Sequence, residues 1–390
     1  MHSMATSAAS FGGTDPRAIA RMVVGEIPEL PVVPALPDRG VGADAVGRTC
    51  ALLVDLPVDL SPRAWRLADS PGRAGRRAAD FLDRDLDALE QQVELARGAV
   101  VDGGSAFPAT AIRFETVGPW SLAARVELPG GRPVLSDSGA RRDLAESLRE
   151  GLSALCSRAR ARFSVPVRLV LDEPELWRIA AGSVPAPSEF DPVAAVPRER
   201  LAMALSRFAA ALRSSDDVDS VFVRAPGRNS SDAPTAWPVL LEPPQGEARV
   251  DGIVFDAADL LAWADAGASA QGRGSDRTRP VHGWADGDRD PQAFALLDAL
   301  GALLSDGGRA ELHRTQVLAG RETPRTNGEA EAVAARIVSL IDRLAVDRPM
   351  AVDNIALAAG ERDTASSTAA AAALAGARRT ADVLPRVAAG

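Results

Sequence analysis

The amino-acid sequence predicts an α/β fold, and in particular a single (β/α)8 barrel, from three observations. Short apolar runs alternate with amphipathic helical stretches along the chain, which is typical of a parallel sheet covered by helices. The run at 165–171 (VPVRLVL) is apolar enough for a buried strand. The chain has 390 residues, of which 46% are hydrophobic, and this is enough for one barrel spanning 1–390.

The expected elements follow one another in βα order. Asp15 and Pro16 open the first helix in the manner of an N-cap and a first-turn proline. Helices are predicted at 17–26, 44–53, 76–97, 141–163, 198–213, 292–304, 329–344 and 365–383. Strands are predicted at 109–117, 165–171, 218–223, 249–255, 315–319 and 350–357, with a weaker candidate at 65–68. The stretch 267–290 has the composition of a mobile insert loop.

Composition and charge exclude several classes of protein. The net charge is −9 and all 44 basic residues are arginine, which argues against non-specific binding to nucleic acid. No stretch has the length and hydrophobicity of a membrane span or a signal peptide, so we expect a cytoplasmic protein. Cys50 and Cys156 are too few for a disulfide framework, and both lie in helical patterns as expected of buried thiols.

The motif of greatest interest is Asp172-Glu173-Pro174, directly after the most apolar predicted strand. Proline ends strand pairing, and the carboxyl ends of parallel strands are where α/β barrels place their chemistry. The two carboxylates are therefore candidates for a binding site. The alternative is that they only cap the next helix.

Several segments resemble the cobalamin-independent methionine synthase family. They are 15–60 (beginning DPRAIARM), 117–128 (VGPWSLAARVEL), 171–174 (LDEP) and 290–301 (DPQAFALLDALG). The resemblance is to the C-terminal catalytic barrel and to single-barrel actinobacterial relatives, with no counterpart of the extra N-terminal barrel. It implies a barrel of the uroporphyrinogen decarboxylase/methionine synthase type and a role connected with methionine biosynthesis.

The family resemblance also implies a chemistry. In the family a zinc ion binds the thiol of homocysteine, which accepts a methyl group from N5 of a methyltetrahydrofolate. Metal coordination removes the thiol proton at neutral pH, and the thiolate is the nucleophile. The implied partners are thus small molecules, an amino-acid thiol and a folate, rather than a nucleic acid or a membrane.

The positions of the family's zinc ligands are poorly kept. Its His-x-Cys pair corresponds to residues 224–226 (Arg-Ala-Pro), its Glu to Asp256, and its Cys-Gly-Leu turn to residues 356–358 (Ala-Leu-Ala). Only Asp256 retains a metal-ligating side chain. The histidines do not replace the lost ligands: His282 lies in the predicted insert, and His313 is expected at the surface. We therefore expect zinc-dependent activity to be reduced or lost.

The substrate-binding positions of the family are better kept. By resemblance, the turn SFGGT at 10–14 corresponds to the family's amino-acid-binding turn, although a lone pair of glycines equally suits a bare turn. The implied substrate-binding residues are Ser10, Phe11, Gly118, Pro119, Trp120, Ser121, Asp172 and Glu173. Trp120, Trp177, Trp237 and Trp263 offer flat surfaces for a pterin ring, although a buried structural role is the alternative for each.

Two hypotheses of different classes follow. The chain is either an S-methyltransferase-like enzyme of this family or a non-catalytic barrel that binds an amino acid or a protein partner, because a fold does not determine a function. Asp172 separates them. It either binds the ammonium group of an amino acid or forms a structural ion pair with an arginine such as Arg224.

Overall fold

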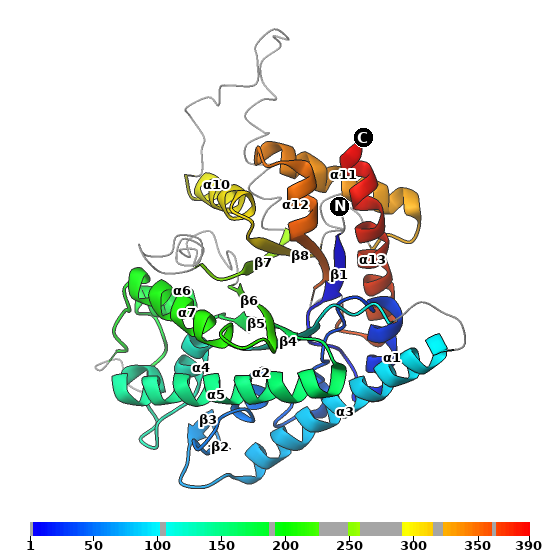
Figure 1. The fold of residues 1–390 in the computed structure, drawn as a ribbon. Coiled ribbons are helices and arrows are strands. Elements are labelled where there is room, and N and C mark those ends of the chain that lie inside the picture. The colour runs from blue at the N-terminus through cyan, green and yellow to red at the C-terminus, as the bar shows by residue number, and fades with distance from the viewer. Residues whose placement is uncertain are drawn as a thin grey trace.

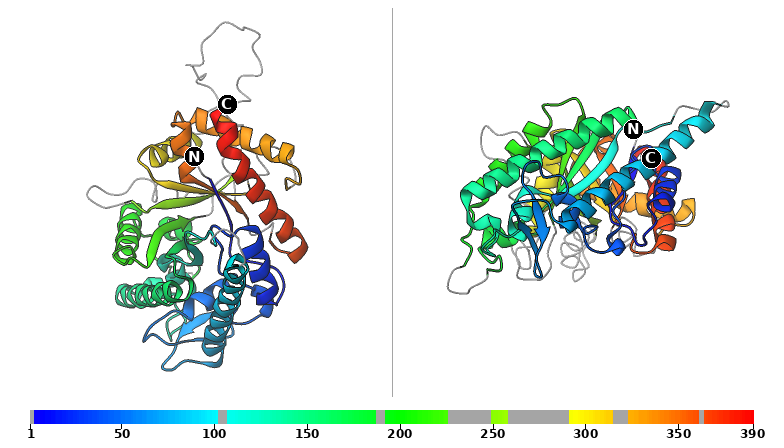
Figure 2. Two further views of the ribbon diagram at one scale, coloured as in Figure 1. Left: turned by 45° about the vertical axis from the view of Figure 1, so that its right-hand side comes forward. Right: turned by 90° about the horizontal axis from the view of Figure 1, so that it is seen from below.

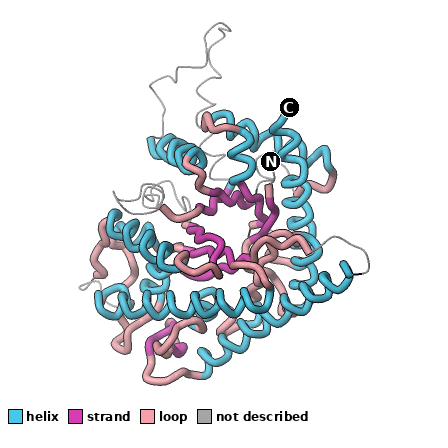
Figure 3. The backbone as a smooth tube through the Cα atoms, in the orientation of Figure 1, coloured by secondary structure: helices cyan, strands magenta, loops and turns pink. Residues whose placement is uncertain are grey.

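The computed structural model describes residues 3–101, 107–186, 192–225, 249–257, 291–314, 323–360 and 364–390. In this part of the chain a curled, seven-stranded sheet lies at the centre and helices surround it (Figures 1 and 3). All neighbouring strands are parallel, in the order β1-β9-β8-β7-β6-β5-β4. Its strands are β1 (Met4–Ser7), β4 (Ile112–Val117), β5 (Val167–Asp172), β6 (Val218–Arg224), β7 (Gly252–Asp256), β8 (Arg309–His313) and β9 (Ile355–Ala359).

The helices cover the outside of this sheet (Figure 2). α3 and α5 lie along one side and are joined by ion pairs from Asp83 to Arg158 and from Asp87 to Arg162. The helices are α1 (Pro16–Glu26), α2 (Ala45–Cys50), α3 (Arg73–Val101), α4 (Pro119–Arg125), α5 (Ser138–Phe163), α6 (Leu176–Ala181), α7 (Arg198–Leu212), α10 (Pro291–Ser305), α11 (Asn327–Arg343), α12 (Arg348–Asn354) and α13 (Ser367–Ala389). In the described residues no helix is long and apolar enough to cross a membrane.

An irregular segment, residues 31–36, lies between the two edges of the sheet. The Val33 amide donates to the Arg113 carbonyl of β4, and the Ala35 amide donates to the Ala9 carbonyl just after β1, at 2.9 and 2.7 Å. Pro31 and Pro34 have no N–H to donate, which prevents a continuous ladder. The (β/α)8 prediction thus corresponds, in the described residues, to seven regular parallel strands and this bridging segment.

Most predicted elements agree with the structure where it describes them. β4, β5, β6 and β7 lie at the predicted positions, and Asp15 caps α1 by accepting from the amides of Arg17 and Ala18. Both cysteines are buried in helices, as predicted. The weak strand at 65–68 is β3 (Trp65–Leu67), which pairs with β2 (Val58–Leu60) apart from the main sheet.

One prediction near the C-terminus is wrong, and one strand there was missed. The predicted strand at 350–357 is largely helix α12, and β9 begins only at Ile355. Asp347 accepts a hydrogen bond from the Met350 amide, and Pro349 occupies the first turn, so local capping starts a helix there. β8 was not predicted, whereas the predicted strand at 315–319 and the insert at 267–290 lie outside the described residues.

Candidate functional site

The carboxyl edge of the sheet collects the polar residues that the sequence singled out. Asp172, Arg224, Asp256 and His313 are the last residues of β5, β6, β7 and β8, and Gly118 directly follows β4. The register pairs Asp172 with Arg224 and Asp256 with His313 on neighbouring strands. Because the strands are parallel, all these residues share one end of the sheet.

Asp172 and Arg224 form a two-pronged ion pair. Arg224 Nε and Nη2 donate to the two carboxylate oxygens of Asp172 at 3.0 and 2.9 Å. Nη2 also lies 2.9 Å from Glu115 Oε1, so the guanidinium is held between two carboxylates. The Asp172 and Arg224 side chains are 18% and 17% exposed, so this pair is accessible at the carboxyl edge of the sheet.

A buried network continues from Glu115 across the interior. Arg113 is fully buried, and its Nη1 donates to Glu115 Oε2 at 2.9 Å while its Nη2 donates to Glu311 Oε1 at 2.8 Å. Burial tends to raise the pKa of Glu115, but the charges of Arg224 and Arg113 outweigh it and lower the pKa to about 2. Burial also tends to raise the pKa of Glu311, but the charge of Arg113 holds that pKa well below its usual range. Both carboxylates are therefore ionised at neutral pH.

His313 is the opposite end of this network, contrary to its predicted surface position. It is 4% exposed, and its Nε2 lies 2.7 Å from Glu311 Oε1. The prediction was wrong because His313 was taken to precede a strand, whereas it is the last residue of β8. Residues two apart on a strand share a face, so His313 lies on the interior side with Glu311.

Glu173 joins the loops that follow β4 and β5. Its buried carboxylate accepts hydrogen bonds from the amides of Trp120 and Ser121 at 3.1 and 2.7 Å, at the N-terminus of α4. A Cβ atom on Gly118 would lie 2.4 Å from Glu173 Oε1, so this approach requires glycine. Burial raises the pKa of Glu173 to about 7. The alternative considered from the sequence was that Glu173 caps the helix that follows it, α6. Its carboxylate instead caps α4, the helix that follows β4.

The remaining residues of the GPWS turn are also packed within the protein. Pro119 and Trp120 are buried, and the Trp120 ring lies 5.1 Å from the Arg141 guanidinium carbon. The hydroxyl of Ser121 accepts a hydrogen bond from the Glu175 amide at 3.0 Å. The side of this turn that meets Asp172 and Glu173 is therefore occupied by contacts within the protein.

The turn after β1 is held by backbone contacts. The Phe11 amide donates to Ala35 and the Gly12 amide donates to Thr364, both at 2.9 Å. Phe11 is buried, whereas Ser10 is partly exposed. A Cβ on Gly12 would lie 2.0 Å from the Ala365 carbonyl oxygen, so the chain here needs glycine for close packing. Of this turn, Ser10 retains an accessible side chain.

Arg314, directly after β8, is a candidate site residue that the sequence did not indicate. Its Nη1 donates to Asp256 Oδ2 at 3.3 Å, while its buried Nε has no hydrogen-bond partner among the described residues. The residue adopts φ 56°, the left-handed region that is uncommon for residues other than glycine. A buried, unbonded N–H is costly, and such strained positions concentrate at functional sites. No sequence pattern marked it, because both features arise only in the folded chain.

The described residues do not fit the zinc ion that the resemblance implies. Arg224 occupies the position of the lost histidine, Asp256 is paired with Arg314, and residues 356–358 lie inside β9 rather than in a turn. No group of three or more His, Cys, Asp or Glu side chains in the described residues could hold a metal. Burial raises the pKa of the Cys156 thiol to about 12 and that of Cys50 still further, so neither thiol is a ready ligand.

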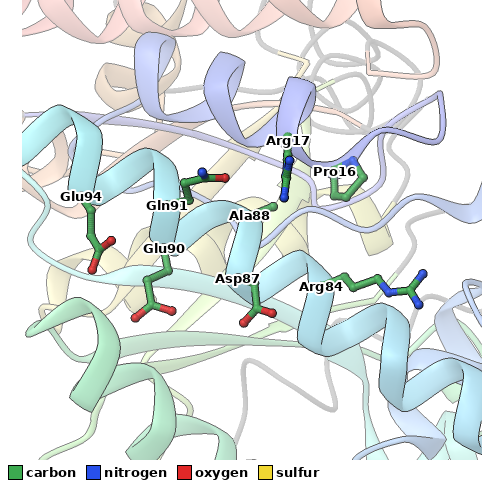
Figure 4. A pocket seen from close by; sticks show the side chains of 8 residues that line it. All are labelled: Pro16, Arg17, Arg84, Asp87, Ala88, Glu90, Gln91 and Glu94. Atoms are coloured by element: carbon green, nitrogen blue, oxygen red, sulfur yellow. The ribbon is translucent and has the colours of Figure 1, made fainter.

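A cavity of about 480 Å³ lies away from this edge. It is bounded by residues of α1 and α3, on the outer helical layer (Figure 4). Its lining mixes Arg17 and Arg84 with Asp87, Glu90 and Glu94. Both helices pack on each other through their apolar sides, so these charged residues form a solvated groove with no convergent set of groups.

Comparisons with known proteins found similarity only among solved structures. No family model matches the chain, and no curated protein does. A B12-independent methionine synthase from Shewanella sp. W3-18-1, in complex with selenomethionine, superposes with a TM-score of 0.38 and 11% identity, covering 75% of this chain and 66% of that one. A methyltransferase from Methanosarcina mazei gives a TM-score of 0.44 and 11% identity, covering 97% and 93%. The chain thus spans just under two thirds of the methionine synthase.

Proposed function

We propose that the chain is a methionine synthase-like barrel that binds an amino acid at the carboxyl edge of its sheet without a zinc ion. The observation that carries this proposal is the unpaired, buried Nε of Arg314 beside Asp256, next to the accessible Asp172–Arg224 pair. Arginine and carboxylate groups alternate along one edge, which complements the carboxylate and ammonium groups of a zwitterion.

The arrangement of charges assigns a role to each group. The ligand carboxylate binds Arg314 through its unbonded Nε and through Nη1, once Nη1 releases Asp256. The ligand ammonium binds Asp256 or Asp172. Arg224 is held in place from below by Glu115, so opening its contact with Asp172 leaves it paired. A zwitterion that opens these pairs replaces each lost charge contact with one of its own, which offsets the cost of opening them.

The same charges account for reduced methyl transfer. A guanidinium at position 224 repels a divalent cation at the place where the family binds zinc. Without a metal to remove its proton, a homocysteine thiol, whose ordinary pKa is about 8.5, is far less activated than in a zinc site. Transfer of a methyl group from a methyltetrahydrofolate would then be slow or absent. The non-catalytic alternative, an amino-acid-binding barrel, is favoured by the same lack of a metal-ligating set in the described residues.

We further infer that residues 31–36 take the place of the second strand and complete an eight-membered barrel. The support is their hydrogen bonding to β4 on one side and to the residues after β1 on the other. We also expect the protein to act in the cytoplasm, where Cys50 and Cys156 would remain reduced.

The proposal is tested by calorimetric titration with homocysteine and with methionine. We expect measurable binding of at least one, and a loss of about 2–4 kcal/mol of binding free energy in Asp172→Asn or Arg314→Gln. Asp342→Asn is the matched control, because Asp342 forms an exposed ion pair with Arg348 between α11 and α12. Failure of both amino acids to bind the parent protein would contradict the proposal.

Two further measurements separate the catalytic and non-catalytic forms of the proposal. Elemental analysis should find far less than one zinc per chain, and a methylation assay with homocysteine and a methyltetrahydrofolate should give little product. One tightly bound zinc per chain together with rapid methylation would show that zinc chemistry survives. Binding without methylation would support an amino-acid-binding barrel.

A further inference from the structure

A second cavity, of about 270 Å³, lies at the amino edge of the sheet, opposite the proposed amino-acid site. Residues near the beginnings of β1, β5, β6, β8 and β9 line it. Arg168, at the second position of β5, and Arg309, the first residue of β8, are its positive groups. Neither residue has a role in the function proposed above.

Arg168 is a buried cation with few partners. It is 2% exposed, and within the described residues its side chain makes one hydrogen bond, from Nε to Asp219 Oδ2 at 3.5 Å, the long limit for such a bond. Its guanidinium carbon lies 5.1 Å from the centre of the Phe222 ring, which supports the flat group from one side. Within the described part of the chain, no protein atom bonds its Nη1 or Nη2. A guanidinium carries five donors, so most of its hydrogen-bonding capacity is unused at the cavity.

One carboxylate oxygen serves both arginines of the cavity. Asp219 Oδ2 accepts from Arg309 Nη1 at 3.1 Å and from the Ser220 hydroxyl at 2.6 Å, besides its long contact with Arg168. Asp353 also lines the cavity, so its two arginines and two aspartates have no net formal charge. The case for a ligand therefore rests on the unused donors of the buried Arg168 guanidinium.

We propose that this cavity binds a small oxyanion, a carboxylate or a phosphate, on Arg168 and Arg309. The planar fork of a guanidinium binds two oxygens of such a group at once, and burial strengthens the contact. The volume lies just below the range of about 300–1,000 Å³ typical of pockets for drug-sized ligands. It therefore suits a small organic acid or phosphate and excludes a nucleotide or a folate.

The test is a titration of the full chain with inorganic phosphate and with succinate, at constant ionic strength set by chloride, followed by calorimetry and by the melting temperature. We expect saturable binding of at least one anion and a rise in melting temperature beyond that in chloride alone. Arg168→Gln should weaken the binding at least tenfold. Arg249→Gln, which removes an exposed ion pair with Asp306 near the same edge, should leave it unchanged.

The outcomes are distinguishable even if Arg168→Gln does not fold. Arg309 is 41% exposed, so the Arg309→Gln variant should fold, and its affinity for the anion should also be lower. If phosphate binds more tightly than succinate, the natural ligand is a phosphate. If succinate binds more tightly, the natural ligand is a carboxylate. Absence of saturable binding, or equal binding by Arg309→Gln and Arg249→Gln, would overturn the proposal. Asp172→Asn should not affect this site, so it stands or fails separately from the amino-acid site.

Discussion

The two ends of the sheet use buried arginines in opposite ways. At the carboxyl edge, Arg224 contacts both oxygens of Asp172 and one of Glu115, so the protein supplies its counter-charges. At the amino edge, Arg168 is more deeply buried and has one long contact with Asp219. A buried cation is tolerated only when something compensates it. The comparison teaches that the fold itself supplies the partners of Arg224, whereas Arg168 keeps donors for the oxyanion proposed above.

The largest expected effect comes from the centre of the network that supports the carboxyl edge. Arg113→Met leaves Glu311 without its main counter-charge and Glu115 with Arg224 alone, in a buried environment. It should reduce the free energy of unfolding by about 3–5 kcal/mol. Urea denaturation measures this. Arg348→Gln, which breaks only an exposed pair, is the control. A loss below about 1 kcal/mol would mean that the network contributes little to stability.

A smaller effect should appear as a pH dependence of stability. The pKa of Glu173 is raised to about 7 from its ordinary value of 4.5, so the folded protein binds this proton more tightly than the unfolded chain does. Its contribution to stability is fully present below pH 4.5 and is lost as the pH rises through about 7. We expect Glu173→Gln to flatten this decline, as measured by urea denaturation between pH 4.5 and 8. Parallel pH profiles for the two proteins would show that Glu173 does not cause it.

The smallest stability effect is expected at the carboxyl edge of the sheet. Asp172→Asn breaks a two-pronged, mostly buried ion pair while Glu115 still holds Arg224, so the free energy of unfolding should fall by about 1–2 kcal/mol. Thermal unfolding without ligand measures it. A loss as large as that of Arg113→Met would assign Asp172 to the structural network and weaken the case for an amino-acid site.

Local patterns in the sequence were sufficient for much of the fold. The apolar run at 165–171 predicted β5, and Asp15-Pro16 predicted the start of α1, because both signals lie within a few neighbouring residues. The same local reasoning failed at 350–354, where Asp347 and Pro349 start a helix within a run that reads as a strand. It also missed β8, whose inward residues are charged rather than apolar.

The sequence by itself placed Asp172 and Asp256 at the ends of predicted strands. Only the tertiary structure decided what these residues contact. Arg113 meets Glu311 across 198 positions of the chain, and Glu173 meets the amide of Trp120 across 53. Such partners come together only when the parallel strands curl around a common interior, and no local pattern records which distant charge will lie opposite. The burial of His313 and the unpaired donors of Arg314 and Arg168 have the same origin.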